Sequence, residues 1–266
     1  MKYRIAVALS ALAAVLQIAQ AQQQSPTDAP HAPDGTTFER INNIYIAPLP
    51  NAPFTATVTA AWTRTLEDGN TLTIQNHRKV ARDSSGRIFQ ERRWFVPNNG
   101  PTEPPLSELD FSNPELHELY ICFPTERVCR LHDYSAPTEF NLIPAGELPN
   151  HNGTLTRVDL GKNTLEGLEV TGTRETTAIA ANTIGNNRPL AITKEFWYSP
   201  QLGINLLVKR MDPRHGTQIF SVSDVKLVAP DPATFKLPKG YTVQDVRNSD
   251  MHNQDPRNSP AGNSTH

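Results

Sequence analysis

The chain of 266 residues lacks most features that mark the common functional classes. Its two cysteines are too few for a disulfide-scaffold mini-protein or for a zinc site of four cysteines. Its 25 Lys and Arg against 27 Asp and Glu leave no basic excess, so the sequence predicts no nucleic-acid partner. Glycine (14) is rarer than proline (23), and prolines spread through the chain exclude long helices and coiled coils. Strands joined by turns are the remaining expectation.

Motifs of catalysis and nucleotide binding are also absent. The chain has no G-x-S-x-G nucleophile elbow, no H-E-x-x-H pair and no Walker glycine loop. His117 and His132 would be diagonal neighbours on one face of a hairpin, which allows two metal ligands, but a metal site needs three or four. Two surface histidines are the simpler interpretation. We therefore predict a non-enzymatic protein with no metal site and no cofactor.

The N-terminus has the three parts of an export signal. Lys2 and Arg4 form a short basic region, and residues 5–18 form an apolar run interrupted by little more than Ser10. Ala19-Gln20-Ala21 is then a small-x-small site that predicts cleavage between Ala21 and Gln22. The alternative is an uncleaved anchor, but the apolar run is short for a membrane span. No second hydrophobic run of that length follows, so no membrane span is expected after cleavage. The predicted location is periplasmic or secreted.

Composition divides the chain into four segments. We predict a signal peptide (1–21), a disordered leader (22–35), a β-rich domain (36–246) and a disordered tail (247–266). The leader and the tail are polar throughout and have too little apolar surface to form a core. The central segment has a length typical of one domain.

Export also determines how the cysteines are interpreted. Cys122 and Cys129 flank a turn that contains Pro124, within a sequence typical of a hairpin, and would face each other across its two strands. A redox-active pair would instead have the closer C-x-x-C spacing. We expect a disulfide that pins the hairpin locally.

Alternation with a period of two dominates the central segment. One face of its first strand is apolar, formed by Phe54, Ala56, Val58, Ala60 and Trp62. The other expected strands are 41–47, 72–80, 87–96, 117–122, 128–134, 154–160, 167–179, 190–198, 203–211 and 217–228. This pattern predicts a mainly β protein with one antiparallel meander of about eleven strands. A helical signal exists only near 105–110, with a turn at 231–235.

Turn residues suggest the register of the first three strands. Joining the apolar faces across the Asp68-Gly69 turn requires a loop of odd length or a bulge. If Asp83 pairs with Gly86, the predicted strands 72–80 and 87–96 on either side of this turn bring side chains together in pairs. These pairs are Val80 with Phe89, Ile74 with Phe95, and Arg78 with Glu91. The sequence thus predicts a charged centre on an apolar surface, and its candidate ligand-binding residues are Trp62, Arg64, Arg78, Phe89, Glu91, Arg93 and Phe95. The alternative is a cross-strand ion pair on a solvated sheet face.

The last third of the central segment resembles known families. The motifs that carry the resemblance include Glu195-Phe196-Trp197-Tyr198-Ser199, Lys209-Arg210-Met211-Asp212-Pro213-Arg214 and the closing Phe235-x-x-Pro-x-Gly-Tyr241. They resemble an uncharacterised family of exported bacterial proteins and, more distantly, the LolA-like lipoprotein-carrier superfamily. The latter resemblance implies an antiparallel sheet curved into a half-barrel around an apolar cavity. The resemblance assigns no functional residue to this chain. Carriers of this superfamily close the cavity with helices, and this chain has little helical sequence to form such a lid.

Two functions from different classes follow from these observations. The leading hypothesis is an exported, non-enzymatic β-rich module that binds a lipid, a lipopeptide or another amphipathic ligand. The alternative is a protein-interaction or envelope-sensing domain whose sheet binds an envelope protein. A hydrolase with an unrecognised site is the third hypothesis.

Overall fold

The computed structural model describes residues 44–136 and 143–247. The predicted signal peptide, its Ala21–Gln22 cleavage site, the leader and all but the first residue of the tail lie outside the described residues. The chain divides into two units, Met1–Ile41 and Asn42–His266, and the fold described below is that of the second. No helix within the described ranges is long and apolar enough to cross a membrane.

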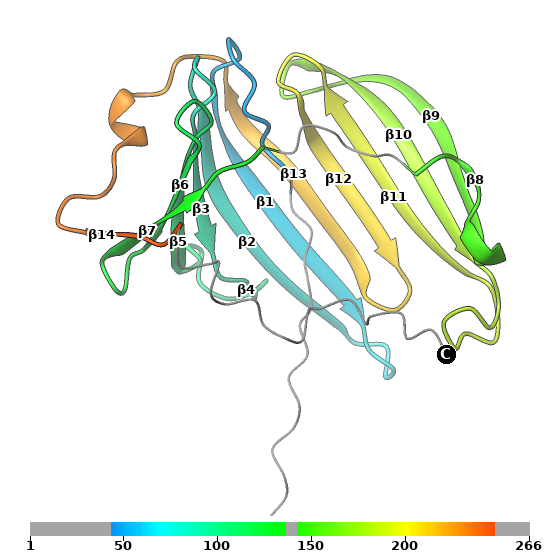
Figure 1. Cartoon of the computed structure of the whole chain (residues 1–266). Coiled ribbons are helices and arrows are strands. Elements are labelled where there is room, and N and C mark those ends of the chain that lie inside the picture. The colour runs from blue at the N-terminus through cyan, green and yellow to red at the C-terminus, as the bar shows by residue number, and fades with distance from the viewer. Residues whose placement is uncertain (1–43, 137–142, 248–266) are drawn as a thin grey trace, which may run out of the picture. The chain divides into compact units, whose positions relative to one another are not determined.

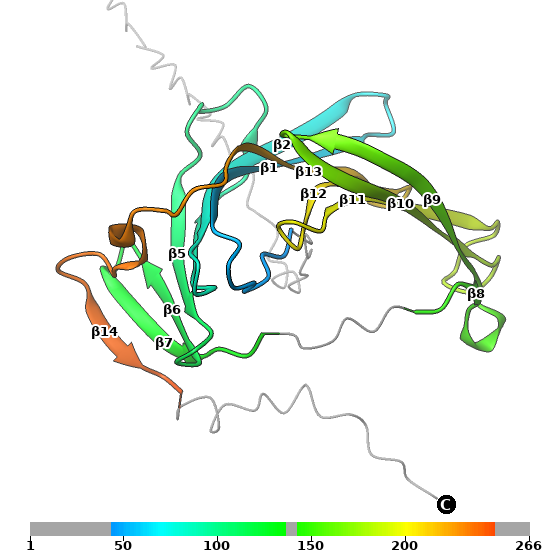
Figure 2. The same cartoon turned by 90° about the horizontal axis from the view of Figure 1, so that it is seen from above.

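The described chain forms one open, curved β-sheet, as the sequence predicted (Figures 1 and 2). Across the sheet the strands follow the order β14-β7-β6-β5-β3-β2-β1-β13-β12-β11-β10-β9-β8, and β4 pairs with β2. The pairs are antiparallel, except that β14 runs parallel to β7. The strands are β1 (Phe54–Thr65), β2 (Thr71–Arg82), β3 (Ile88–Arg93), β4 (Val96–Pro97), β5 (Leu106–Asn113), β6 (Glu118–Phe123), β7 (Val128–Asp133), β8 (Gly146–Glu147), β9 (Gly153–Leu165), β10 (Leu168–Ile179), β11 (Leu190–Ser199), β12 (Ile204–Asp212), β13 (Gly216–Lys226) and β14 (Thr242–Asp245). Two 3-10 turns, η1 (Pro149–His151) and η2 (Pro232–Phe235), are the helical elements of the described ranges.

The β1–β2 hairpin has the predicted loop of odd length. Thr65 pairs with Thr71, so residues 66–70 form the loop, and Trp62 lies opposite Ile74. The apolar faces of the two strands therefore coincide. The five predicted apolar residues of β1, from Phe54 to Trp62, are all buried. We call the face that bears them the inner face.

The predicted register of β2 and β3 is wrong by one residue. The backbone N–H of Asp83 donates to the carbonyl of Arg87, not of Gly86, which leaves a three-residue loop. Gly86 has φ = +88°, a conformation that favours glycine and accommodates the extra residue. Ala81 therefore lies opposite Phe89, and Phe89 is on the outer face. The predicted contacts of Val80 with Phe89, Ile74 with Phe95 and Arg78 with Glu91 do not form, because a one-residue shift reverses every side chain.

Two further predictions differ from the structure. The weak helical signal near 105–110 belongs to β5, because pairing with β3 and β6 outweighs its local propensity. The described part of the predicted strand 41–47 is not a strand. It belongs to an irregular segment, residues 44–53, which we call the arm, and Figure 2 shows the arm inside the curve of the sheet. The inner face is therefore concave.

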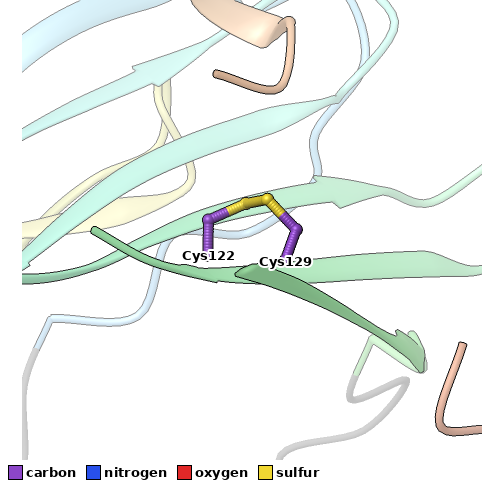
Figure 3. The surroundings of a disulfide bond; sticks show 2 residues. All are labelled: Cys122 and Cys129. Atoms are coloured by element: carbon purple, nitrogen blue, oxygen red, sulfur yellow. A yellow bond between two sulfur atoms is a disulfide. The ribbon is translucent and has the colours of Figure 1, made fainter. Parts of the chain in front are cut away.

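The disulfide lies on the outer face, within a small apolar cluster. Cys122 and Cys129 are bonded and directly opposite on β6 and β7, as predicted, and Figure 3 shows the bond between their strands. Both cysteines are fully buried, packed with Phe111 against the C-terminal Leu237 and Tyr241. The closing motif of the sequence thus covers the disulfide, and β14 continues from it along β7.

Removing the disulfide should destabilise this edge of the sheet. The double variant Cys122→Ala/Cys129→Ala is expected to lose about 2 kcal/mol of unfolding free energy, because the bond closes only a short loop. Urea denaturation measures the loss. Wild-type stability in the variant would show that packing under Leu237 and Tyr241 holds the hairpin without the bond.

Candidate ligand-binding site on the inner face

The predicted charged centre does not assemble. Glu91 pairs with Arg93 at 2.9 Å and accepts the backbone N–H of Lys79 at 3.1 Å, while Arg93 also donates to the carbonyl of Pro104. Phe89 packs on the outer face, with its ring 5.2 Å from that of Phe111. The half-buried Phe95 lies between β3 and β4. This group secures the β2–β3 edge, where regular pairing stops.

Three of the predicted residues belong to the inner side of the β1–β2 hairpin. Trp62 is buried, and its indole N–H donates to the carbonyl of His215 at 2.5 Å. The guanidinium of Arg64 lies 4.4 Å from the centre of the Trp62 ring. Arg78 is buried halfway along β2 and donates to the side chain of Gln90 and to the carbonyl of Ile44 in the arm.

Arg82, which is not among the candidate residues predicted from the sequence, holds the arm against the sheet. Its side chain is 0% exposed and donates to the carbonyls of Ala47 at 2.6 Å and Ala52 at 2.9 Å. A third bond, of 2.8 Å, goes to Leu202 in the β11–β12 loop. Burial lowers the pKa of Arg82 to about 10 and the pKa of Arg78 to about 9. Both guanidiniums therefore stay charged at neutral pH.

A row of polar side chains crosses the other half of the inner face. The row begins beside Trp62 of β1, and the strand register places its members side by side in neighbouring strands: Gln218, Arg210, Lys194, Glu175 and Arg157. An apolar row runs parallel to it, two residues further along the strands: Ala60, Phe220, Val208 and Phe196. Polar and apolar groups thus share one surface in two parallel bands.

A cavity of about 150 Å³ opens between the two rows and the arm. Its lining consists of Ile44, Tyr45, Lys194, Phe196, Asn205, Val208, Arg210, Gln218 and Phe220. Two buried polar atoms here, Nε of Arg210 and Oε1 of Gln218, have no hydrogen-bond partner. Buried polar atoms are usually paired, so this cavity is suited to a ligand that has both polar and apolar parts.

Carboxylates beside the cavity are already paired. Glu175 lies 2.6 Å from Arg157. The carboxylate of Asp212 accepts two hydrogen bonds from the Arg214 guanidinium, at 3.0 and 2.9 Å, and lies 3.2 Å from His215. These hydrogen bonds, chiefly those from Arg214, hold the pKa of Asp212 well below its ordinary range. Asp212 is therefore ionised throughout the physiological range.

The depressed pKa predicts how Asp212 contributes to stability. Its contribution is complete above the unfolded-state pKa of about 4 and is lost as the pH falls towards the lower folded-state value. Asp212→Asn should cost about 2–4 kcal/mol at pH 7, because Arg210 and Arg214 lose a buried counter-charge. The difference from wild type should shrink below about pH 4, which urea denaturation at several pH values measures. A difference that stays constant down to about pH 2.5 would contradict this role.

Larger cavities open elsewhere in the described chain. One of about 460 Å³ lies over β1, β2 and β3 and is lined by Lys79, Phe89 and Lys226 among others. One of about 350 Å³, at the β12–β13 turn, is rich in threonine. Neither is lined by a buried polar atom without a partner. The chemistry of the inner cavity, and not its size, makes it the candidate site.

The residues of this cavity are not among those predicted from the sequence. Three neighbouring strands each place an apolar and a polar residue two positions apart: Phe196 with Lys194, Val208 with Arg210, and Phe220 with Gln218. This repeated alternation was the available signal. It acquires meaning only when the three strands are aligned in register.

Comparisons with known proteins give distant structural neighbours. No family model matches the chain, and no curated protein matches it. An uncharacterized conserved protein from Thermus thermophilus is 11% identical, with a TM-score of 0.38, over 73% of this chain and 91% of that chain. MucB, in the Pseudomonas aeruginosa MucA/MucB complex, is 11% identical, with a TM-score of 0.35, over 70% of this chain and 56% of that chain. A LolA superfamily protein from Nitrosomonas europaea is 10% identical, with a TM-score of 0.27, over 71% of this chain and 91% of that chain. The third of these neighbours belongs to the LolA superfamily, which the sequence resembles. All three TM-scores are below 0.5, so none of these similarities supports an inference about the family, the ligand or the partner of this chain.

Proposed function

We propose that this chain is an exported, non-enzymatic β-rich module that binds a lipid, a lipopeptide or another amphipathic ligand on the inner face of its sheet. The observation that carries the proposal is the inner cavity, in which apolar walls meet buried polar atoms without partners. Phe196, Val208 and Phe220 would contact the apolar part of the ligand, and the polar row would orient its head group.

The apolar wall supplies the driving force for such a ligand. Burying a methylene group contributes about 0.8 kcal/mol, so an alkyl chain that buries roughly six or seven of them gains roughly 5 kcal/mol before the costs of association. The polar row adds orientation, because a hydrogen bond to a buried group that would otherwise lack a partner is favoured. Together these terms suit an amphiphile better than a fully polar or fully apolar ligand.

The size of the cavity adds a requirement. Its volume of about 150 Å³ is below the ~300–1,000 Å³ typical of ligand pockets. The arm and Leu202 occupy adjoining parts of the inner face, held there by Arg82. An alkyl chain longer than the cavity must therefore displace the arm. We expect residues 44–53 to lose amide protection when the ligand binds.

A titration of the exported chain with an alkyl-chain fluorescent probe tests the proposal. A neutral naphthylamine dye should bind with a saturable signal, at one site per chain, and an unlabelled amphiphile below its micellar concentration should displace it. Hydrogen exchange on the same samples reports whether the arm moves. A dye signal that rises linearly without saturation, with an arm that stays protected, would contradict binding on the inner face.

One observation favours a protein partner as the second candidate function. The inner face already binds a polypeptide segment without regular secondary structure, the arm, through hydrogen bonds from the guanidinium groups of Arg78 and Arg82 to its carbonyls. An extended segment of an envelope protein could take the same place. In that case a partner peptide, and not an amphiphile, should release the arm in the exchange experiment.

A further inference from the structure

We infer that the ligand of the inner cavity carries an anionic head group, which Lys194 and Arg210 bind together. This inference rests on the proposed function and specifies the chemistry of the same site. Four observations support it: a cation without a counter-ion, a second cation with an unused donor, a buried amide beside them, and an adjoining apolar wall.

Lys194 is the cation without a counter-ion. It is half-buried in β11 and lines the cavity, and no carboxylate in the described part of the chain lies within ion-pair distance of it. Its neighbour on β10 is Glu175, but that carboxylate is paired with Arg157 at 2.6 Å. The charge of Lys194 therefore remains available to a ligand.

Arg210 lies directly opposite Lys194 on β12 and adds a second positive charge. Like charges in directly opposed cross-strand positions repel each other, which favours an anion between them. Arg210 is 3.5 Å from Asp212, but Arg214 is the closer partner of that carboxylate. The buried Nε of Arg210 has no acceptor. A bound oxyanion would accept from this N–H and reduce the repulsion.

Gln218 provides a polar group at the back of the same cavity. Its side chain is only 5% exposed, it is the cross-strand neighbour of Arg210, and its Oε1 has no hydrogen-bond partner. A flip of the amide turns its NH₂ group to the same point, where it can donate to an oxyanion. A ligand hydroxyl could instead donate to Oε1. Either arrangement satisfies a buried group that the protein alone leaves without a partner.

The apolar wall fixes where the rest of the ligand lies. Phe196 and Val208 are two residues from Lys194 and Arg210 on the same strands and point to the same face, about 7 Å along each strand. An anionic group held by the two cations therefore places its alkyl chain against these side chains. The chemical class is an alkyl chain with one anionic head group, either the carboxylate of a fatty acid or the phosphate of a lipid.

Head-group selectivity tests the inference. Dodecanoate, dodecyl phosphate and neutral dodecanol, each below its micellar concentration, compete with the neutral dye on wild type and on Lys194→Gln. Wild type should bind at least one of the two anions about tenfold or more tightly than dodecanol. Lys194→Gln should lose most of this preference and keep its affinity for dodecanol. Arg210→Gln should show the same pattern.

Lys209→Gln is the matched control. Lys209 precedes Arg210 on β12, points to the outer face and lies 4.0 Å from Glu195, so the variant removes one positive charge away from the cavity. It should keep wild-type selectivity, which separates a local contact from an effect of net charge. Preference for only dodecanoate indicates a fatty acid, and preference for only dodecyl phosphate indicates a phospholipid.

Equal affinity for the anions and for dodecanol in wild type would overturn the inference. Selectivity that persists in Lys194→Gln and in Arg210→Gln would also overturn it. Neither result affects the proposed function, because the alkyl chain still binds. If the dye and all three amphiphiles fail to bind, the proposed function fails instead.

Discussion

Arg82→Met is expected to lower the free energy of unfolding by about 3–5 kcal/mol and to release the arm from the inner face. The Arg82 guanidinium is fully buried, and its donors satisfy the carbonyls of Ala47, Ala52 and Leu202. Methionine fills a similar volume but donates no hydrogen bond. The carbonyls of Ala52 and Leu202 would then lose this donor, and that of Ala47 would keep only the N–H of Leu49. Moving the arm into solvent is the least costly way to satisfy them.

Urea denaturation measures the loss of stability, and hydrogen exchange measures the release of the arm. Arg174→Met is the matched control, because Arg174 is largely exposed and pairs with Glu195 across β10 and β11. Removing that surface pair should cost less than about 1 kcal/mol. Equal effects of the two substitutions, or an arm that stays protected in Arg82→Met, would show that Arg82 does not hold the arm.

Filling the inner cavity is expected to produce the largest change in binding. Val208→Trp places an indole ring in the space between Phe196, Phe220 and the arm, and we expect it to weaken amphiphile binding by about tenfold or more. Because the cavity is empty of protein atoms, the larger side chain should cost no more than about 1–3 kcal/mol of stability.

The dye titration described above measures this loss. Leu207→Trp is the control, because Leu207 is the preceding residue of β12 and points to the outer face. It introduces the same ring without filling the cavity and should keep wild-type affinity. Wild-type affinity in Val208→Trp would place the binding site elsewhere, with the outer cavities beside Lys79 or at the β12–β13 turn as the alternatives.

Much of the fold is predictable because strand alternation and turn chemistry are local. The apolar residues from Phe54 to Trp62, the odd loop at Asp68-Gly69 and the pairing of Cys122 with Cys129 follow from residues close in sequence. The mainly β class and the open, curved sheet follow from the sum of such local patterns. For these features no distant contact competes with the local preference.

The candidate site is less predictable because it depends on register and on distant segments. The left-handed conformation of Gly86 adds one residue to the β2–β3 loop, and this shift separates Arg78 from Glu91. The polar row that includes Lys194 and Arg210 forms only when β13, β12, β11, β10 and β9, which are neighbours in the sheet, are aligned in register. The arm depends on bonds from Arg82 to carbonyls of Ala47 and Ala52, 35 and 30 residues away, which no local pattern encodes.

Binding of an amphiphile on the inner face is the central claim, and native mass spectrometry of the chain, expressed from its full sequence and recovered without detergent, tests it most directly. Lipid extraction of the same sample identifies what is bound. We predict a reproducible additional mass corresponding to one amphiphile with an anionic head group per chain, and its absence from Val208→Trp. A wild-type chain that is consistently recovered at the mass of the protein alone, and takes up no added dodecanoate or dodecyl phosphate, would contradict the claim.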